Sequence, residues 1–118
     1  MAGRPRPKKN LKARVEKCSY LLEKEPALLK GKWLGEYKEL HLEIGCGKGN
    51  FICGMAEKNP EIMFIGVECV ENVIVTAMEK ASEAGLKNVR FICGNARYLL
   101  QVQAPEFQAK LFGDAGGR

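Results

Sequence analysis

The chain has 118 residues, of which 46% are hydrophobic and 28% are charged, a composition typical of one soluble domain. Its apolar runs are shorter than the ~20 residues that a membrane-spanning helix requires, and no secretory pattern follows the basic N-terminus, so we expect a cytoplasmic protein without a membrane segment. The five cysteines form no Cys-x-x-Cys pair and the only histidine is His41, so neither a disulfide framework nor a metal site is expected.

The excess positive charge lies at the N-terminus. Residues 1 to 30 have a net charge of +6, whereas residues 31 to 118 have a net charge of −1. A basic segment on a near-neutral body is typical of a protein that binds a polyanion, because Lys and Arg displace counterions from phosphates. A solvated, disordered tail has the same composition, and charge alone does not separate the two interpretations.

Residues 1 to 38 are predicted to form a basic arm and an accessory helix. The arm runs to about Asn10 and should have no fixed structure. Apolar residues then recur at intervals of three and four, which predicts a short helix from Leu11 until Pro26 interrupts it. A connector with a lone Trp33 follows, and this side chain is expected to pack the extension onto the body.

From residue 39 the pattern repeats a strand and a helix. Strands are predicted at Leu40–Ile44, Ile62–Val67 and Val89–Cys93, and helices at Phe51–Lys58 and Glu71–Ala84. Strands separated by helices of this length imply parallel pairing through right-handed crossovers. The predicted fold is therefore an open α/β sheet with flanking helices.

The pattern fades after Leu100, and residues 101 to 118 are interpreted as an atypical tail. Residues 39 to 100 would then hold about three strands, which is the N-terminal part of a parallel sheet only. Such a sheet leaves an edge and a half-covered core, because parallel sheets ordinarily bury both faces. We therefore expect the chain to be incomplete.

The glycine-rich segment Gly45-Cys46-Gly47-Lys48-Gly49 follows the first predicted strand. It is not a P-loop, because Gly47-Lys48 is followed by Gly49 and not by Ser or Thr. It matches the first two glycines of the dinucleotide fingerprint, but Asn50 stands where the third glycine should be. NAD is therefore the less favoured ligand.

The pattern that fits is Glu-x-Gly-x-Gly-x-Gly, with Glu43 two residues before Gly45. Glycine at Gly45 and Gly47 lets a ligand lie against bare backbone at the end of a strand, and Glu43 can orient a ligand ammonium group. Glu68, at the end of the second strand, is placed to accept both hydroxyls of a ribose. Two carboxylates around a glycine loop favour a cationic sulfonium ligand, S-adenosylmethionine. A purely structural turn is the alternative.

Three further polar residues have weaker assignments. Asn95 closes the third strand, where its amide could contact an adenine edge or could simply belong to a turn. Lys48 is expected to face solvent. Glu71 is interpreted as a first-turn helix charge and not as a ligand. Cys53, Cys69 and Cys93 lie among apolar residues and are expected to pack as small hydrophobes.

The chain resembles the bacterial tRNA (guanine-N7-)-methyltransferases over roughly residues 5 to 100. The resemblance rests on the motifs Leu40-His41-Leu42-Glu43-Ile44-Gly45-Cys46-Gly47-Lys48-Gly49-Asn50-Phe51, Asn59-Pro60, Phe64-Ile65-Gly66-Val67-Glu68 and Ala84-Gly85-Leu86-Lys87-Asn88-Val89, in this order and spacing. The lead-in Lys8-Lys9-Asn10-Leu11 and the connector Gly31-Lys32-Trp33 also match, and these segments are not shared by class I methyltransferases in general.

This resemblance implies a Rossmann-like class I methyltransferase fold with S-adenosylmethionine bound by Glu43, Gly45, Gly47, Glu68 and Asn95. It implies methyl transfer to N7 of a guanine in the variable region of tRNA. The family's later Asp-Pro-Trp-Pro strand and basic tRNA-binding segment have no counterpart here, so no catalytic residue is assigned and the chain alone is expected to be inactive. The alternatives are another class I methyltransferase or a non-catalytic remnant that binds the cofactor or RNA.

Overall fold

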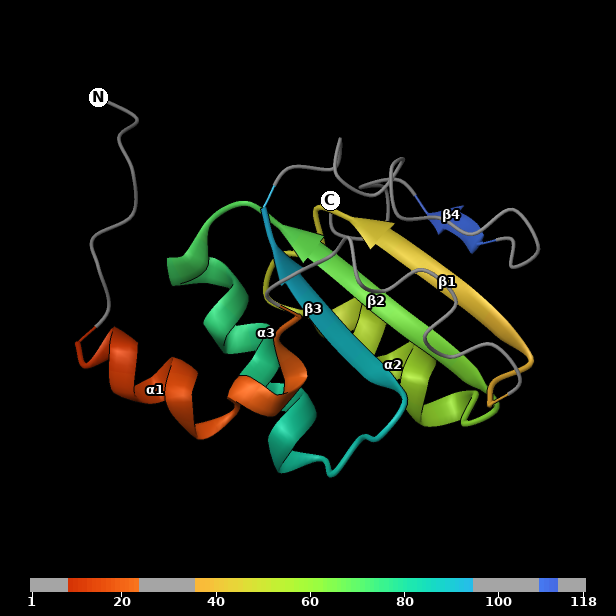
Figure 1. The fold of residues 1–118 in the computed structure, drawn as a ribbon, viewed down its shortest axis with the longest axis horizontal. Helices are drawn as coiled ribbons and strands as arrows, with labels where there is room; N and C mark the ends of the chain where they lie inside the picture. Colours follow the sequence, from red (N-terminus) through yellow and green to blue (C-terminus); the bar gives the residue numbers. More distant parts are fainter. Residues whose placement is uncertain (1–8, 24–35, 95–108, 113–118) are drawn as a thin grey trace.

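The computed structural model describes residues 9–23, 36–94 and 109–112. Its centre is a parallel sheet in the order β3-β2-β1-β4 (Figure 1). The strands are β1 (Glu39–Ile44), β2 (Ile62–Glu68), β3 (Val89–Cys93) and β4 (Ala109–Phe112). The helices are α1 (Leu11–Lys17), α2 (Asn50–Lys58) and α3 (Glu71–Glu83), and a short 3₁₀ turn, η1, spans Ser19–Leu21.

The predicted strands and helices from residue 39 to residue 93 are confirmed, with bounds that differ by one residue at most. Asn59 ends α2 with its backbone N–H bonded to the Ala56 and Met55 carbonyls. Gly85 ends α3 in the left-handed region, at φ 66°, which only glycine adopts at little cost. These ends follow from local sequence, so they were predictable.

The fourth strand was not predicted. β4 pairs in parallel with the free edge of β1, with Leu40 opposite Ala109 and Glu43 opposite Phe112. It has four residues and lies within the segment 101 to 118 that sequence analysis set apart, where so short a stretch shows no period.

The position of β4 creates a switch point in the sheet, because the chain steps from β1 to β2 to β3 and then returns to the other side of β1. In open α/β sheets, ligands bind at the carboxyl ends of the strands where the direction of winding reverses.

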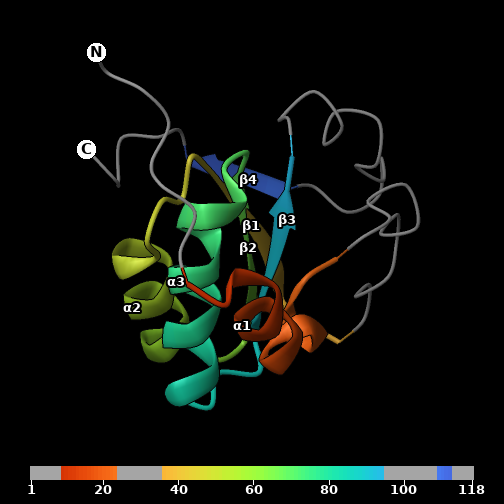
Figure 2. The same cartoon turned by 90° about the vertical axis from the view of Figure 1, so that its left-hand side faces the viewer.

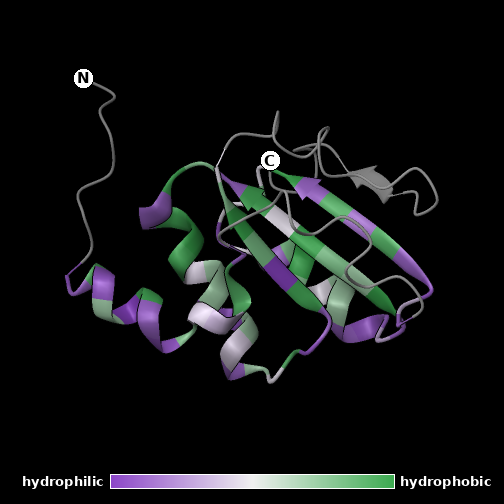
Figure 3. Ribbon diagram, in the orientation of Figure 1, coloured by the Kyte–Doolittle hydropathy of each residue, from purple (hydrophilic) through white to green (hydrophobic). Residues whose placement is uncertain are grey.

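The helices cover one face of the sheet (Figure 2). Between α2, α3 and this face lies the larger apolar cluster, which includes Phe64, Met78 and Phe91. A second apolar cluster lies on the opposite face and includes Met63, Ile65 and Ile92. β2 contributes to both clusters and is buried along almost its whole length, as its mostly apolar colour suggests (Figure 3). Burial on both faces is the expected state of a central parallel strand.

The N-terminal helix is shorter than predicted. α1 ends at Lys17, and η1 and an extended Leu22 follow well before Pro26. The reason is tertiary: Leu22 forms a parallel bridge with Phe91 of β3, and the Glu23 N–H donates to the Phe91 carbonyl at 2.8 Å. Pairing with the edge of β3 competes with continuation of the helix.

This N-terminal segment belongs to the core. Val15, Cys18 and Leu21 are buried in the helix-side core, α1 packs against α3, and the Arg14 guanidinium donates twice to the Glu79 carboxylate, at 2.7 and 2.5 Å. The predicted arm before residue 9 and the connector with Trp33 lie outside the described residues. Within the described part of the chain, no helix is long and apolar enough to cross a membrane.

The cysteines divide into two environments. Cys18 and Cys46 are buried, and Cys53 is partly buried against the helix-side core, as a small hydrophobe should be. Cys69 and Cys93 are exposed. The prediction that these two pack as hydrophobes is wrong, because they lie at the carboxyl ends of β2 and β3, beyond the cover of the helices.

Asn88 holds the opposite end of the sheet together. Its buried side-chain amide donates to the carbonyls of Ala56, Asn59 and Ile62 at 2.9, 2.9 and 3.0 Å. The three acceptors lie at the end of α2, in the turn after it and at the start of β2. One amide therefore satisfies backbone groups that have moved out of water.

We expect Asn88→Ala to lower the free energy of unfolding by about 2–3 kcal/mol, because buried carbonyls lose their donor. Urea denaturation measures the change. Lys87→Ala, an exposed neighbouring side chain, is the matched control and should change stability by less than about 0.5 kcal/mol. Equal stability of the two variants would contradict this role of Asn88.

Candidate functional site

The glycine loop connects the carboxyl end of β1 to the start of α2. Its three glycines all have positive φ, 74° at Gly45, 56° at Gly47 and 87° at Gly49. Residues with a Cβ adopt this region only at a cost. The alternating glycines are therefore required by the path of the backbone, independently of any ligand.

The end of β2 holds this loop in place. The N–H groups of Gly45 and Cys46 both donate to the Val67 carbonyl, at 2.7 and 2.9 Å. The next N–H, that of Gly47, donates to Oε1 of Glu68 at 3.2 Å. Oε2 of Glu68 accepts from the Val70 N–H at 3.2 Å, just before α3. The Glu68 carboxylate thus joins the loop to the β2–α3 turn, and a carboxylate has lone pairs left for further donors.

Two glycines allow close approach of neighbouring elements. A Cβ on Gly49 would lie 2.7 Å from Cβ and 2.9 Å from Cα of Ala77 in α3. A Cβ on Gly66 in β2 would lie 2.8 Å from the Cys46 thiol and 2.9 Å from Cδ1 of Ile52. The loop is therefore packed against α3 on one side and against β2 on the other.

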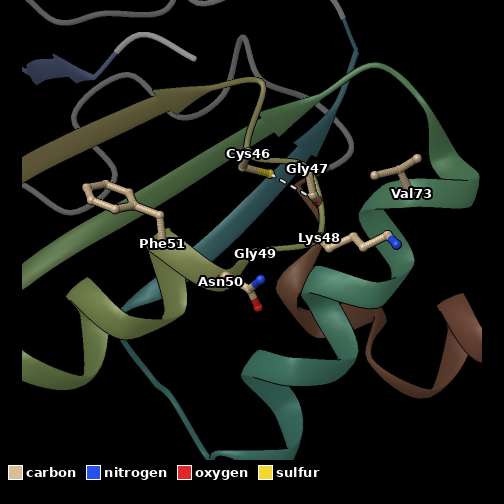
Figure 4. A pocket seen from close by; sticks show the side chains of 7 residues that line it. All are labelled: Cys46, Gly47, Lys48, Gly49, Asn50, Phe51 and Val73. Atoms are coloured by element: carbon tan, nitrogen blue, oxygen red, sulfur yellow. Dashed lines mark hydrogen bonds between the residues drawn. The ribbon is translucent and has the colours of Figure 1, made fainter. Parts of the chain in front are cut away.

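A cavity of about 380 Å³ opens along the loop. It is lined by loop residues and by Phe51 and Val73, which extend from the starts of α2 and α3 on opposite sides of the loop (Figure 4). Gly47 contributes bare backbone to this cavity, and a Cβ built on it would meet no heavy atom within 4 Å. A ligand could lie against Gly47 at a distance that a side chain would prevent.

Glu43 is the most unusual side chain near the loop. It is 2% exposed, and neither carboxylate oxygen has a hydrogen-bond partner within the described structure. Strand alternation from His41, whose ring packs against Phe64 of the helix-side core, directs Glu43 to the helix-covered face. Burial raises its pKa to about 7. A buried carboxylate without a donor is costly, and a ligand ammonium group would relieve that cost.

Both carboxylates act electrostatically on one thiol of the loop. The pKa of Cys46 is raised mainly by burial and further by the negative charges of Glu43 and Glu68. Both carboxylates are therefore within electrostatic reach of the start of the loop. Negative charge gathered around a glycine loop favours a cationic ligand.

The structure brings together four of the five predicted site residues, Glu43, Gly45, Gly47 and Glu68, at the carboxyl ends of β1 and β2. Asn95 lies outside the described residues. The side chain of Lys48 is exposed, as predicted, and Glu71 is an exposed residue in the first turn of α3. In the described ranges, no group of three or more His, Cys, Asp or Glu side chains is arranged to hold a metal ion.

Sequence reasoning did not find Lys80. From α3 its ammonium group donates to the Lys48 carbonyl at 3.1 Å and also to the side-chain oxygen of Asn50. This lysine ties α3 to the loop at Lys48 and Asn50, whereas Glu68 is bonded to it at Gly47. Its place on one turn of a helix gives no signal in the sequence, because the contact depends on how α3 packs against the loop.

Comparisons with known proteins agree on one family. The model of a family described as "putative methyltransferase" matches residues 37–112. A tRNA (guanine-N(7)-)-methyltransferase of Listeria welshimeri is 44% identical over 91 residues, which cover 75% of this chain and 42% of the relative. The enzyme of the same name from Halalkalibacterium halodurans is 44% identical over 95 residues, covering 78% and 43%. The chain thus spans less than half the length of these relatives.

A solved structure agrees on the fold. A crystal structure of a putative S-adenosyl-L-methionine-dependent methyltransferase from Methanococcus maripaludis aligns with a TM-score of 0.51 and 11% identity, over 94% of this chain and 68% of that one. At this identity the likeness shows the Rossmann-like fold alone.

We expect Gly49→Ala to destabilise the protein by about 2–4 kcal/mol, because an alanine there combines positive φ with a clash against the backbone of Ala77. Gly54→Ala is the matched control in the interior of α2, where a Cβ meets nothing within 4 Å, and it should stabilise the helix by about 0.5–1 kcal/mol. Thermal unfolding distinguishes the two. A neutral Gly49→Ala would show that the loop does not need this close approach.

The raised pKa of Glu43 predicts that the protein becomes less stable as pH rises. The folded state holds a proton on Glu43 up to about pH 7, whereas the unfolded chain releases it near the ordinary carboxyl pKa. The contribution of Glu43 to the free energy of unfolding is therefore largest below that ordinary pKa. It is lost as pH rises through about 7, which lowers the free energy of unfolding by up to about 3 kcal/mol. Urea denaturation at several pH values should show this loss, and Glu43→Gln should remove it. An unchanged pH profile in the variant would contradict the assignment.

Proposed function

We propose that this chain, which belongs to the putative methyltransferase family, is the S-adenosylmethionine-binding part of a tRNA (guanine-N7-)-methyltransferase. The geometric observation that carries the cofactor assignment is the glycine loop at the switch point of the sheet, with the Glu68 carboxylate bonded to it and the buried Glu43 carboxylate nearby, which has no hydrogen-bond partner among the described residues. The name of the 44% identical relatives supports the tRNA substrate.

The described residues fit the chemistry of this cofactor. The carboxylate of Glu43 would pair with the ammonium group of the methionine moiety, which supplies the donor that Glu43 lacks within the described residues. The backbone at Gly45 and Gly47 would lie against that moiety. Glu68, already held by the Gly47 and Val70 N–H groups, would accept the ribose hydroxyls. We keep Asn95 as the candidate contact to adenine.

The proposed reaction mainly requires that the methyl donor and guanine N7 are aligned. Bound S-adenosylmethionine supplies a methyl group on a positively charged sulfur, which is an electrophile. Guanine N7 already has an available lone pair, so no strong base is needed to create the nucleophile, and positioning dominates the rate. Glu43 and Glu68 would position the donor. The residues that hold the guanine are not assigned within this chain.

The N-terminal charge suits an RNA partner. The net charge of +6 over residues 1 to 30 would attract tRNA phosphates and make binding fall as salt rises. Within the described residues, Lys9, Lys12 and Lys17 are exposed parts of this basic segment. With tRNA as substrate, the cytoplasm is the proposed location.

We expect Glu68→Ala to weaken binding of S-adenosylmethionine by tenfold or more, equivalent to about 1.4 kcal/mol, because the variant loses both the ribose acceptor and the Gly47 contact. Isothermal titration calorimetry measures the affinity. Glu68→Gln keeps one acceptor for Gly47 and should lie between the wild type and Glu68→Ala.

Glu71→Ala is the matched control, because it removes an exposed carboxylate three residues further along the chain, and it should bind nearly as tightly as the wild type. A chimera in which this chain replaces the matching segment of the Listeria welshimeri relative should transfer methyl label from S-adenosylmethionine to tRNA. Transfer to no tRNA would reject the proposed substrate, and equal binding by Glu68→Ala and Glu71→Ala would reject the proposed site.

A further inference from the structure

Cys69 and Cys93 lie at neighbouring strand ends on the edge of the sheet that carries the glycine loop. Cys93 is the last residue of β3 and pairs in register with Glu68, the last residue of β2. Cys69 follows Glu68 directly, and both cysteines are exposed. The methyl-transfer chemistry proposed above uses neither thiol.

The register brings the two cysteines within reach of a disulfide. The Gly94 N–H donates to the Glu68 carbonyl at 3.1 Å, so the pairing of β2 with β3 continues to the last residue. Neighbouring strands lie ~4.8 Å apart and successive Cα atoms lie ~3.8 Å apart, so the Cα atoms of Cys69 and Cys93 lie at most roughly 8.6 Å apart, and closer where the chain turns toward β3 after Glu68. Disulfides span Cα distances of about 4.4–6.8 Å.

Both thiols lie on the side of the Glu68 carboxylate. Residues paired in register direct their side chains to the same face, so Cys93 shares the face of Glu68. The chain bends after β2, and this bend brings the Cys69 thiol to 3.9 Å from Oε2 of Glu68. The thiols also interact electrostatically. The pKa of Cys93 is raised first by partial desolvation and then by the electrostatic influence of Glu71, Cys69 and Glu68.

We propose that Cys69 and Cys93 form a dithiol that peroxide oxidises to a disulfide, and that this disulfide weakens ligand binding at the glycine loop. The first part stands on the geometry alone. The second part rests on the proposed function, because it takes Glu68 as a cofactor ligand. In reducing compartments, the disulfides that do form are usually transient and are reduced back to dithiols.

The oxidation balances with hydrogen peroxide as the oxidant. One thiolate attacks a peroxide oxygen, the O–O bond breaks, and the released hydroxide takes up a proton to leave as water; the cysteine becomes a sulfenic acid. The second thiol then attacks the sulfenyl sulfur, the S–O bond breaks, the S–S bond forms and a second water leaves. Two thiols are oxidised by two electrons and the peroxide is reduced to two waters. A dithiol reductant reverses the step by thiol–disulfide exchange.

The disulfide would act on the site through Glu68. The carboxylate oxygen that contacts the Cys69 thiol also accepts the Val70 N–H, and the other oxygen accepts the Gly47 N–H. Drawing the Cys69 sulfur toward β3 moves the turn that holds one oxygen, while the loop holds the other. The carboxylate would then lose the placement that a ribose diol requires.

Peptide mapping tests the first part on the full 118-residue chain. The purified protein is treated with hydrogen peroxide, its remaining thiols are alkylated, and it is digested with trypsin. The five cysteines fall in five different tryptic peptides, so each pairing has its own mass. We expect a cross-link between residues 59–80 and 91–97 that dithiothreitol removes. Cys69→Ser and Cys93→Ser should each abolish it, and Cys53→Ala should keep it. Alkylated Cys69 and Cys93 after oxidation, or pairing of either with another cysteine, would overturn the proposal.

Calorimetry with S-adenosylhomocysteine tests the second part. We expect the oxidised protein to bind about tenfold more weakly than the reduced protein, with recovery after reduction and no effect of peroxide on Cys93→Ser. A cross-link that leaves the affinity unchanged would overturn the regulatory part. A reduced protein that binds no S-adenosylhomocysteine but still forms the cross-link would reject the proposed function and leave the dithiol in place.

Discussion

The structure depends on the alignment of two parallel strand ends. β1 and β2 pair from Glu39 opposite Ile62 to Ile44 opposite Val67, so β1 ends one residue before β2 does. The Val67 carbonyl, opposite the end of β1, accepts two successive N–H groups of the glycine loop. The loop can turn sharply only because its first hydrogen bonds continue the sheet. A shift of register by one residue would move the acceptor and reverse the face of every side chain in β1.

This constraint explains why the loop needs glycine beyond any contact with a ligand. A chain that doubles back onto β2 and then enters α2 must pass through positive φ, and it must also approach Ala77 of α3 closely at Gly49. The same packing leaves open space above Gly47, in contrast to Gly49. The position best suited to ligand contact is therefore the one that the protein's own packing leaves free. Glu68 and Lys80 hold the loop at successive residues, Gly47 and Lys48.

The two carboxylates of the site differ in their hydrogen bonding. Glu68 is held by two backbone N–H groups, which makes it a rigid acceptor. Glu43 has no donor among the described residues although it is almost completely buried. A buried carboxyl group of this kind is stable when it stays protonated or when a ligand donates a hydrogen bond to its ionised form. Because the pKa of Glu43 is about 7, both forms are accessible near neutral pH. Binding of a cationic ligand at the loop would therefore favour the ionised form of Glu43.

Much of the fold could be predicted because it is written in local patterns. Alternation and apolar runs locate β1, β2 and β3, and three- and four-residue spacing locates α3. The elements that were missed are defined by partners distant in sequence. β4 is four residues long and is recognised only by its pairing with β1, and α1 stops early because Leu22 bridges to Phe91. The exposure of Cys69 and Cys93 was missed for the same reason, since apolar neighbours in sequence say little about strand ends.

The sequence by itself determined which residues could form a site: the glycines that permit the loop, and Glu43 and Glu68 at the ends of two strands, because turn and strand preferences act over a few residues. Only the tertiary structure decided how these residues are used. It buried Glu43 without a partner in the described region, engaged both oxygens of Glu68, placed β4 beside β1 so that the loop lies at a switch point, and brought Cys69 and Cys93 to the ends of neighbouring strands. Burial, register and electrostatic reach arise between segments far apart in the chain, and no local pattern encodes them.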